Sequence, residues 1–421
     1  MIRTDYPELD ETVYREPLPC GLETIVVPRK GFTRHLAYFV TDYGSIHTDF
    51  TLDGETFRAP DGVAHFLEHK MFDLPGRDVS GEFAAMGASV NAFTSYDMTA
   101  YYFTATENFS DCLKLLLEFV STPYFTKESV DKEQGIIGQE IGMNDDSPDT
   151  RVFENLMEIM YREHPVRVPI LGTAQTIGTI TPEILYRCHR AFYTPGNMIL
   201  CVVGDVEPEE VASIANTVLG MERKSVGSKN RLWREEMTCP DGLIRASMEV
   251  AMPSFQLGFK CEPTGSGEEA IRREVVGDLA AEALFGESSA LYLRLYEQGW
   301  IDSSFGGGFE TLDGCALLTC GGDSDCPEAV RDAILEEARR LGDAGVEEAA
   351  FARMKRSALG RRMKDLDGFD STCFRLCAYA MSDFDYFRFP EIYREVTGEE
   401  VRQFLRTVVT EDRAALSVVE P

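Results

Sequence analysis

A stretch of about two dozen residues in the middle of this chain recurs, without a gap, 216 residues further on. The first copy, TPEILYRCHRAFYTPGNMILCVVGDV, starts at Thr181, and the second, TGEEVRQFLRTVVTEDRAALSVVEP, starts at Thr397. Each copy predicts a capped helix, a short turn and a strand, since Thr181 and Pro182 are residue types favoured at the N-cap and first helical position. Any two helix–strand units resemble each other, but an ungapped match of this length favours a true internal repeat.

The repeat predicts an α+β fold made of two similar domains. Before the first copy, strand-like runs and helical patterns alternate, and residues 89–106 form a β-rich stretch. We expect the first domain at residues 1–221 and the second at residues 243–421. The polar segment 222–242, ERKSVGSKNRLWREEMTCPDG, is the predicted linker.

The charge balance narrows the range of partners. With 71 acidic against 41 basic residues, the formal net charge is −30, which argues against nucleic acid or an anionic membrane as the main partner. Basic ligands are weakly favoured, although many acidic proteins are simply soluble.

The N-terminal residues lack the pattern of a secretory signal, and no run approaches the ~18 apolar residues of a membrane span. The eleven cysteines contain no C-x-x-C pair, and Cys373 and Cys377 lie at helical spacing in an apolar stripe, where core packing is expected. Together these features predict a cytoplasmic protein with reduced thiols.

The sequence HFLEH, residues 65–69, is the strongest chemical signal in the chain. On a helix, His65 and His69 share one face and can offer two imidazoles to one metal, with Glu68 close enough to act on a nearby water. This is the inverse of the H-E-x-x-H zinc helix and is known among metalloproteases. A chance match is expected only about 0.01 times in a chain with so few histidines.

A catalytic zinc needs a third protein ligand. Periodicity does not choose it, because Glu82, Glu107 and Glu118 are all available. In DKEQGIIGQEIGMND, Glu133 and Glu140 are seven residues apart and therefore share a helix face. Gly135 and Gly138 between them predict that another element packs closely there, because glycine costs about 1 kcal/mol inside a helix. The alternative is a solvated acidic face.

The repeat does not carry the histidines into the second copy. A shift of 216 residues places His65 on Ala281 and His69 on Phe285. The second domain is therefore predicted to lack the metal site.

At this point the chain resembles the pitrilysin, insulin-degrading and mitochondrial processing peptidase family, whose members carry H-x-x-E-H and a distal helix with two glutamates seven apart. The resemblance spans nearly the whole chain. It implies His65, His69 and Glu140 as ligands of one Zn²⁺, Glu68 as the general base, and Glu133 as an acid that supports a ligand. The stretch GASVNAFTSYDMTAYYF resembles the family's substrate-facing strand, which implies that Asn91, Ala92, Phe93 and Thr94 bind substrate.

The segments LEHKMF, GIIGQEI and EHPV resemble most the bacterial, processing-peptidase-like subgroup of the YmfH kind. The fold that this implies is half of a clamshell, in which each of two α+β domains has a mostly antiparallel sheet with helices on one face. The implied function is that of a zinc-dependent endopeptidase. A non-catalytic structural subunit and a peptide-binding module with structural metal are the alternatives.

A departure from the family pattern predicts a partner. In the family, the half without zinc supplies an arginine and a tyrosine after an S-x-L-y-x-x-L-R helix, and these hold the substrate near the metal. Here Ser289 and Leu291 to Leu295 follow the pattern, but Tyr296 stands at the arginine position and Asp302 at about the tyrosine position. Arg294 is two residues early, and the alternative is that it takes the place of the arginine through a local shift. We therefore expect a heterodimer with a family member that lacks H-x-x-E-H but keeps the arginine and the tyrosine.

Overall fold

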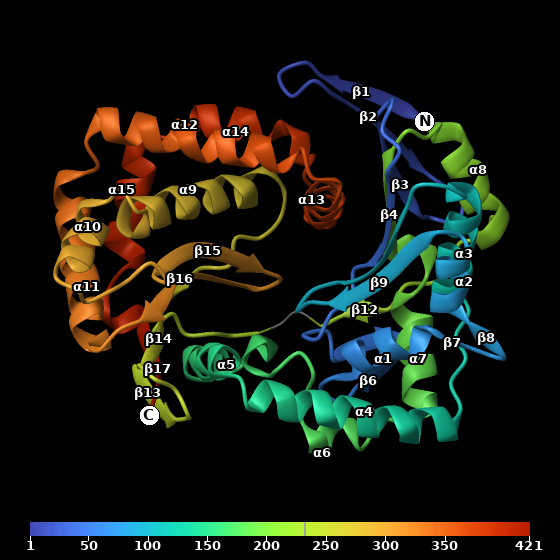
Figure 1. Cartoon of the computed structure of the whole chain (residues 1–421), viewed down its shortest axis with the longest axis horizontal. Coiled ribbons are helices and arrows are strands. Elements are labelled where there is room, and N and C mark those ends of the chain that lie inside the picture. Colours follow the sequence, from blue (N-terminus) through green and yellow to red (C-terminus); the bar gives the residue numbers. More distant parts are fainter. Residues whose placement is uncertain (231–232) are drawn as a thin grey trace.

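The computed structural model describes residues 1–230 and 233–421, and each half of the chain is built around one large sheet (Figure 1). The first sheet has seven strands in the order β1 (Ile2–Tyr6), β2 (Glu11–Pro17), β3 (Glu23–Pro28), β11 (Met198–Gly204), β4 (His35–Thr41), β10 (Thr99–Ala105) and β9 (Ala88–Thr94). The second has five strands in the order β13 (Leu243–Ser247), β17 (Ala414–Glu420), β14 (Ser254–Cys261), β16 (Cys315–Asp323) and β15 (Gly306–Leu312).

Without the β1–β2 hairpin, the two sheets have the same topology. In each, the first strand pairs in parallel with the last strand of its half, β3 with β11 and β13 with β17, and every other pair of neighbouring strands in the two sheets is antiparallel. The repeat seen in the sequence is α7 (Pro182–Phe192) with β11, and α15 (Gly398–Val408) with β17. Thr181 and Thr397 both cap their helices by accepting a hydrogen bond from a backbone N–H. The predicted α+β fold of two similar, mostly antiparallel halves is confirmed.

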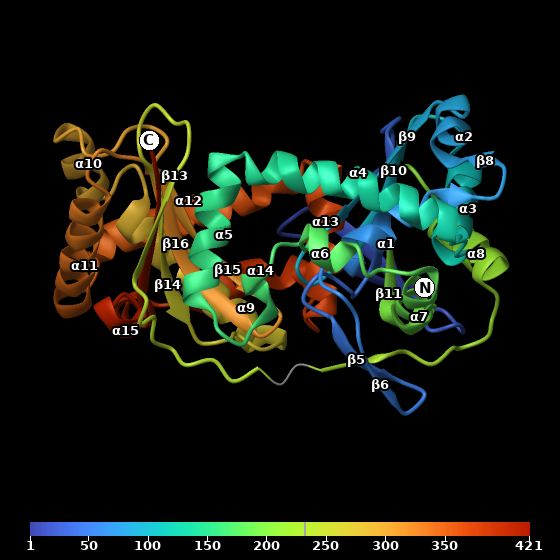
Figure 2. The ribbon, with the colours of Figure 1, turned by 90° about the horizontal axis from the view of Figure 1, so that it is seen from below.

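The boundaries at residues 221 and 243 stay predictions, and residues 231–232 of the expected linker lie outside the described residues. Within that segment, β12 (Ser228–Lys229) pairs with β5 (Asp49–Leu52), which in turn pairs with β6 (Glu55–Arg58). The described parts of this segment, 222–230 and 233–242, run along one side of the molecule (Figure 2). A further short hairpin, β7 (Asp73–Leu74) and β8 (Arg77–Asp78), follows the first helix.

Helices of the first half cover one face of the first sheet. They are α1 (Val63–Met71), α2 (Val79–Ala85), α3 (Phe109–Ser121), α7 and α8 (Pro208–Leu219), and α4 (Lys127–Asp145) and α6 (Ala174–Ile177) pack outside them. Alternate strand residues such as Val26, Phe39 and Leu200 point into this core. Their neighbours Ile25, Tyr38 and Cys201 point to the opposite face, as the two-residue period of a strand requires.

The opposite face of each sheet is covered by a helix from the other half. Helix α13 (Phe369–Met381) packs on β4 and β11 of the first sheet, and α5 (Pro148–Met160) packs on β14 and β17 of the second. Figure 1 shows α5 against the second sheet and α13 beside the first. Gly258 in β14 permits this approach, because a Cβ there would overlap Met160 of α5. Each sheet therefore has the helices of its own half on one face, as expected. Its other face is covered by one helix of the other half, and we call this arrangement the exchange of α5 and α13.

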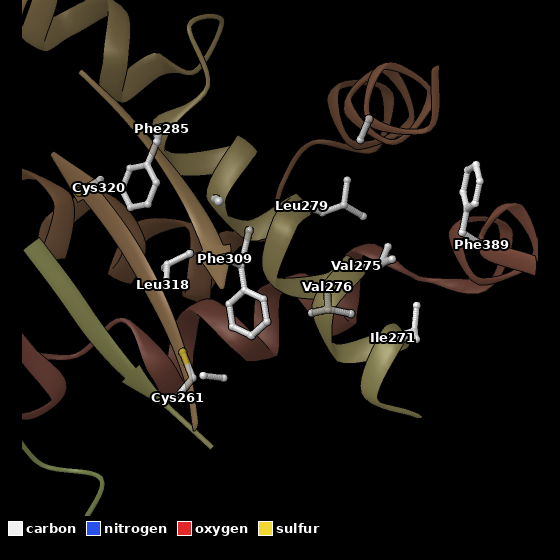
Figure 3. Packing of buried hydrophobic residues seen from close by; sticks show 14 of the residues in the cluster. Cys261, Ile271, Val275, Val276, Leu279, Phe285, Phe309, Leu318, Cys320 and Phe389 are labelled. Atoms are coloured by element: carbon white, nitrogen blue, oxygen red, sulfur yellow. The ribbon is translucent and has the colours of Figure 1, made fainter. Parts of the chain in front are cut away.

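Three helices of the second half pack on its sheet, and they are α9 (Gly267–Phe285), α11 (Pro327–Ala344) and α15. Three others pack on α9, and they are α10 (Ala290–Glu297), α12 (Glu348–Asp365) and α14 (Phe389–Glu395). In Figure 3, Phe309 of β15 stands between Leu318 of β16 and Val276 of α9. Gly277 of α9 makes room for that ring, since a Cβ there would overlap Phe309.

All eleven cysteines are free, and ten of them are buried. Cys373 and Cys377 lie in the core with Cys201, as the apolar pattern predicted. Among the helices of the described residues, none combines the length and the apolar character needed to cross a membrane.

Candidate metal centre

The histidine pair lies on α1, a short helix buried along most of its length. The helix begins after Gly62, whose φ of 89° lies in the left-handed region where glycine is favoured. A Cβ at Gly62 would also overlap Leu171 O. The helix is packed into the core through Phe66, Leu67 and Met71. Because the helix lies in the core, its polar residues His65 and Glu68 are buried as well.

The two glutamates lie on α4, which is 19 residues long and crosses close to α1. Its first turn is fixed by a capping box, in which Thr126 Oγ1 accepts from Ser129 N and Ser129 Oγ is bonded to the backbone of Thr126. Glu133 and Glu140 are two helical turns apart and both face α1.

The structure brings His65, His69 and Glu140 together. Their ligand atoms all lie within 4.8 Å of one another, and no other group of at least three such side chains does so among the described residues. His65 Nε2 is 3.7 Å from Glu140 Oε1, and His69 Nε2 is 3.8 Å from Glu140 Oε2. Two imidazoles and one carboxylate converging on one point form a donor set that suits zinc, which binds such atoms at about 2 Å.

The two histidines are held differently. His69 Nδ1 lies 3.1 Å from Glu133 Oε1, which fixes the ring with Nε2 toward Glu140. His65 is 8% exposed, and its Nδ1 has no hydrogen-bond partner among the described residues, so packing alone orients this ring. Burial lowers the pKa of His65 to about 4, with a contribution from His69. A histidine that binds a metal must be neutral, and burial favours that form.

The hydrogen bond to Glu133 raises the pKa of His69. Burial opposes ionisation of Glu133 itself, but the bonds to His69 and Lys70 lower its pKa overall. Glu133 is therefore held as a carboxylate behind a histidine, the usual partner of a metal-binding imidazole.

Glu68 stands beside the three donors and is 8% exposed. Burial raises the pKa of its carboxyl group. Thr94 Oγ1 donates a 2.6 Å hydrogen bond to Glu68 Oε2. Sequence reasoning placed Thr94 on the substrate strand and missed this contact, because a register between a strand and a helix is not encoded locally.

Lys70 is a second residue that sequence reasoning missed. It directly follows His69, and its ammonium group is buried against Glu133, Asp73 and Ser129 O. The available signal was a lysine on a predicted helix that also carries Phe66, Leu67, Met71 and Phe72 next to the histidine motif.

The predicted substrate strand, 91–94, lies in β9 at the free edge of the first sheet. Ser95 N donates to Met98 O where the β9–β10 hairpin closes, and hydrogen-bonded and non-hydrogen-bonded pairs alternate from there. By this alternation Asn91 and Phe93 use their main-chain groups in the ladder with β10. Ala92 and Thr94 direct theirs to the free edge, and Ala92 N–H is already bonded to Asn91 Oδ1.

One expectation about α4 is wrong. Gly135 and Gly138 were expected to mark close packing, but a Cβ at either position would meet no atom within 4 Å among the described residues. Glu82, Glu107 and Glu118 do not join the two histidines, and Glu82 and Glu118 instead pair with Arg77 at 2.6 and 3.0 Å.

The second half has no counterpart of the three donors among the described residues. Ala281 and Phe285, which correspond to His65 and His69, line a cavity of about 600 Å³ between α9, α12 and β15.

An inverted histidine pair on one helix, met by a glutamate from a second helix, is the arrangement of the H-x-x-E-H metallopeptidases. Residues 56–174 match the insulinase domain of peptidase family M16, and residues 179–358 match the peptidase M16 inactive domain. The uncharacterized zinc protease YmfH of Bacillus subtilis (strain 168) is 38% identical over 99% of this chain and 98% of its own length. The chain therefore belongs to peptidase family M16.

Solved structures agree with this family and with a half-clamshell fold. A putative M16-like peptidase from Alicyclobacillus acidocaldarius matches with a TM-score of 0.94 and 32% identity over 98% of both chains. Pitrilysin matches with a TM-score of 0.81 at 16% identity, over 99% of this chain and 46% of pitrilysin. That likeness shows the fold, and this chain spans about half the length of pitrilysin.

Proposed function

We propose that this chain is a zinc-dependent metalloendopeptidase that hydrolyses peptides or small proteins, with one Zn²⁺ per chain held by His65, His69 and Glu140. The observation that carries the proposal is the convergence of these three donors from α1 and α4. Two histidines and one glutamate are a donor set of catalytic zinc sites, which keep one further position open.

The residues around the donors supply what hydrolysis needs. When bound, zinc polarises a peptide carbonyl and makes water more acidic. Glu68, which follows His65 by three residues and directly precedes His69 on α1, accepts the proton of the attacking water and returns it to the leaving amine. The hydroxyl of Thr94 holds this carboxylate at the edge strand, and so places the base beside the peptide that it acts on.

The substrate would add to β9 as a further antiparallel or parallel strand. Its main chain would bond with Ala92 and Thr94, whose main-chain groups face the free edge. Asn91 Oδ1 would then give up the Ala92 N–H to the peptide. Recognition through the main chain is only weakly selective for sequence, so this site accepts many peptides.

The proposal is tested by a Glu68→Gln variant. We expect full zinc content by metal analysis and a fall in peptide hydrolysis of at least 10³-fold, because the general base is lost while all three donors remain. A variant that retains wild-type hydrolysis would refute the role of Glu68. Zinc bound by a wild-type chain without any hydrolysis, alone or with a partner, would instead favour a structural or peptide-binding subunit.

We further propose that the active form is a heterodimer with a family member that lacks H-x-x-E-H and carries the substrate-holding arginine and tyrosine. Support comes from α10, where Ser289 caps the helix and Leu295 is buried. Tyr296, at the arginine position, is 52% exposed. Asp302, at the tyrosine position, accepts hydrogen bonds from Ser304.

The partner proposal is tested by activity with and without a co-expressed relative of that kind. Arg294 is exposed on α10 two residues before the expected position. Robust hydrolysis by the single chain, abolished by Arg294→Ala, would show that Arg294 replaces the missing arginine and would overturn the heterodimer. A gain of at least tenfold on adding the partner is the expected result.

A further inference from the structure

Lys70 is a charged residue at a position that is buried in the core. Its side chain is 1% exposed, on a helix whose neighbouring residues Phe66, Leu67 and Met71 all belong to the core. Burying an ammonium group without partners costs several kcal/mol, and a leucine or methionine here would pack at no such cost. The position therefore requires an explanation beyond packing.

Lys70 has three polar partners, and Glu133 is one of them. The Lys70 ammonium lies 3.6 Å from Glu133 Oε2 and 3.4 Å from Ser129 O, and it also contacts the carboxylate of Asp73. The other oxygen of Glu133, Oε1, is 3.1 Å from His69 Nδ1. One carboxylate thus bridges the lysine and a histidine, with one oxygen for each.

We propose that Lys70 is a positioning residue for the metal centre. By holding Glu133 Oε2, it leaves Oε1 to bind His69 Nδ1–H, so that His69 Nε2 points to the metal position. The inference rests on the proposed zinc site and assigns a role within it to a residue that is not a ligand.

The direction in which zinc affinity changes on removal of Lys70 distinguishes a positioning role from direct charge repulsion between Lys70 and the metal. A buried cation near a metal site repels a divalent cation, so removal of Lys70 would tighten zinc binding if charge alone mattered. Removal would weaken binding if Lys70 acts through Glu133, because Lys70 holds Glu133 against His69, and loss of such a partner of a ligand typically costs ~10–100-fold in affinity.

The test is the zinc affinity of a Lys70→Met chain, measured by competition with a chelator of known affinity. Methionine matches the length of the lysine stem and suits the apolar surroundings. We expect zinc binding at least tenfold weaker than in the wild type, with the melting temperature of the metal-free protein unchanged or raised. Unchanged or tighter zinc binding would overturn the inference.

A double-mutant cycle shows whether the effect passes through Glu133. In a Glu133→Gln background, Lys70→Met should change zinc affinity by less than about threefold. An equal tenfold loss in both backgrounds would mean that Lys70 acts on the fold alone, and would refute the positioning role.

Two further variants serve as a control and as a substitute for Lys70→Met. Asp73→Asn alters the other carboxylate at Lys70, whose side chain is 47% exposed, and should keep zinc affinity within about threefold of the wild type. If Lys70→Met fails to fold, Lys70→Gln should still weaken zinc binding, because a neutral amide is a weaker partner of a carboxylate. A wild-type chain that binds no zinc would refute the proposed function and this inference together, whereas a wild-type chain that binds zinc isolates the role of Lys70.

Discussion

The hydroxyl of Thr94 donates a 2.6 Å hydrogen bond to the Glu68 carboxylate. This hydrogen bond links the free edge strand of the first sheet, β9, to the helix that carries both histidines. If substrate adds to β9, the residue that contacts its main chain is also the residue that orients the proposed base.

Replacing Thr94 by valine should therefore reduce catalysis while leaving the metal in place. A hydrogen bond to a charged group contributes about 1.5–3 kcal/mol, so kcat should fall roughly 10- to 100-fold. Thr94→Ser keeps the hydroxyl and should recover most of the rate. Steady-state hydrolysis of a fluorogenic peptide, with zinc content measured in parallel, checks this, and equal rates for the valine and serine variants would contradict it.

Proline substitutions distinguish the N–H groups of β9 that face the free edge from those that bond with β10. Ala92→Pro removes an N–H that faces the free edge, so the sheet should survive while peptide hydrolysis falls below detection. Phe93→Pro removes an N–H of the ladder with β10 and should destabilise the fold by about 3 kcal/mol. Thermal unfolding and activity of the two variants check this pair, and normal turnover by Ala92→Pro would place the peptide elsewhere.

Replacing one of the three donors should lower the zinc content far more than replacing a nearby acidic residue. His65→Ala removes one of three ligands and should strip most of the zinc, whereas Glu133→Gln should weaken binding ~10–100-fold. Glu82→Gln is the matched control, since Glu82 is an acidic residue of the same half that pairs with Arg77. Metal analysis after dialysis gives the stoichiometry, and undiminished zinc in His65→Ala would rule out the assignment.

The exchange of α5 and α13 predicts that neither half folds by itself. Residues 1–221 lack α13, so Leu36, Tyr38 and Cys201 would lose their cover and face water. Co-expression of residues 1–221 with residues 243–421 should restore a folded complex. Thiol titration is a direct measurement, because Cys201 should react quickly in the isolated half and slowly in the complex. A cooperative thermal transition of the isolated half would contradict the prediction.

Stability should fall in mild acid because of a buried histidine in the first half. His47 Nδ1 accepts from Gly44 N at 3.0 Å, and Nε2 lies 3.2 Å from Asp313 Oδ2. Burial lowers the pKa of His47 from 6.5 to about 4. A lowered folded-state pKa contributes stability above pH 6.5, and this contribution is lost as the pH falls toward 4.

For His47 the loss should reach about 2 kcal/mol by pH 5. Urea unfolding at pH 7 and pH 5 measures it. His47→Gln can keep both hydrogen bonds without titrating, so the free energy of unfolding of that variant should change less between the two pH values. An identical pH dependence for the variant and the wild type would show that other groups dominate.

Local sequence was sufficient for the elements that depend on neighbours in the chain. The capped helices at Thr181 and Thr397 and the helix bearing His65 and His69 follow from capping chemistry and periodicity. The repeat follows from an ungapped match of about two dozen residues at a spacing of 216. These patterns are readable because hydrogen bonds within a turn and the facing of residues four apart involve only residues close in sequence.

The packing around α4 was not readable in the same way. Gly135 and Gly138 looked like a contact surface, yet they face open space, because a glycine records only that a side chain is dispensable. The choice of Glu140 over Glu82 and Glu118 also had no basis in periodicity. It depends on α4 crossing α1, which is a contact between helices about 70 residues apart.

By itself, the sequence determined the α+β repeat, the inverted histidine motif and the absence of its histidines from the second copy. Only the tertiary structure decided that Thr94 holds Glu68, that Lys70 and His69 share Glu133, and that each sheet is covered by a helix from the other half. The physical reason is that the first set rests on interactions local in the chain. The second set rests on contacts between residues at least 26 positions apart, which form only when both cores are packed.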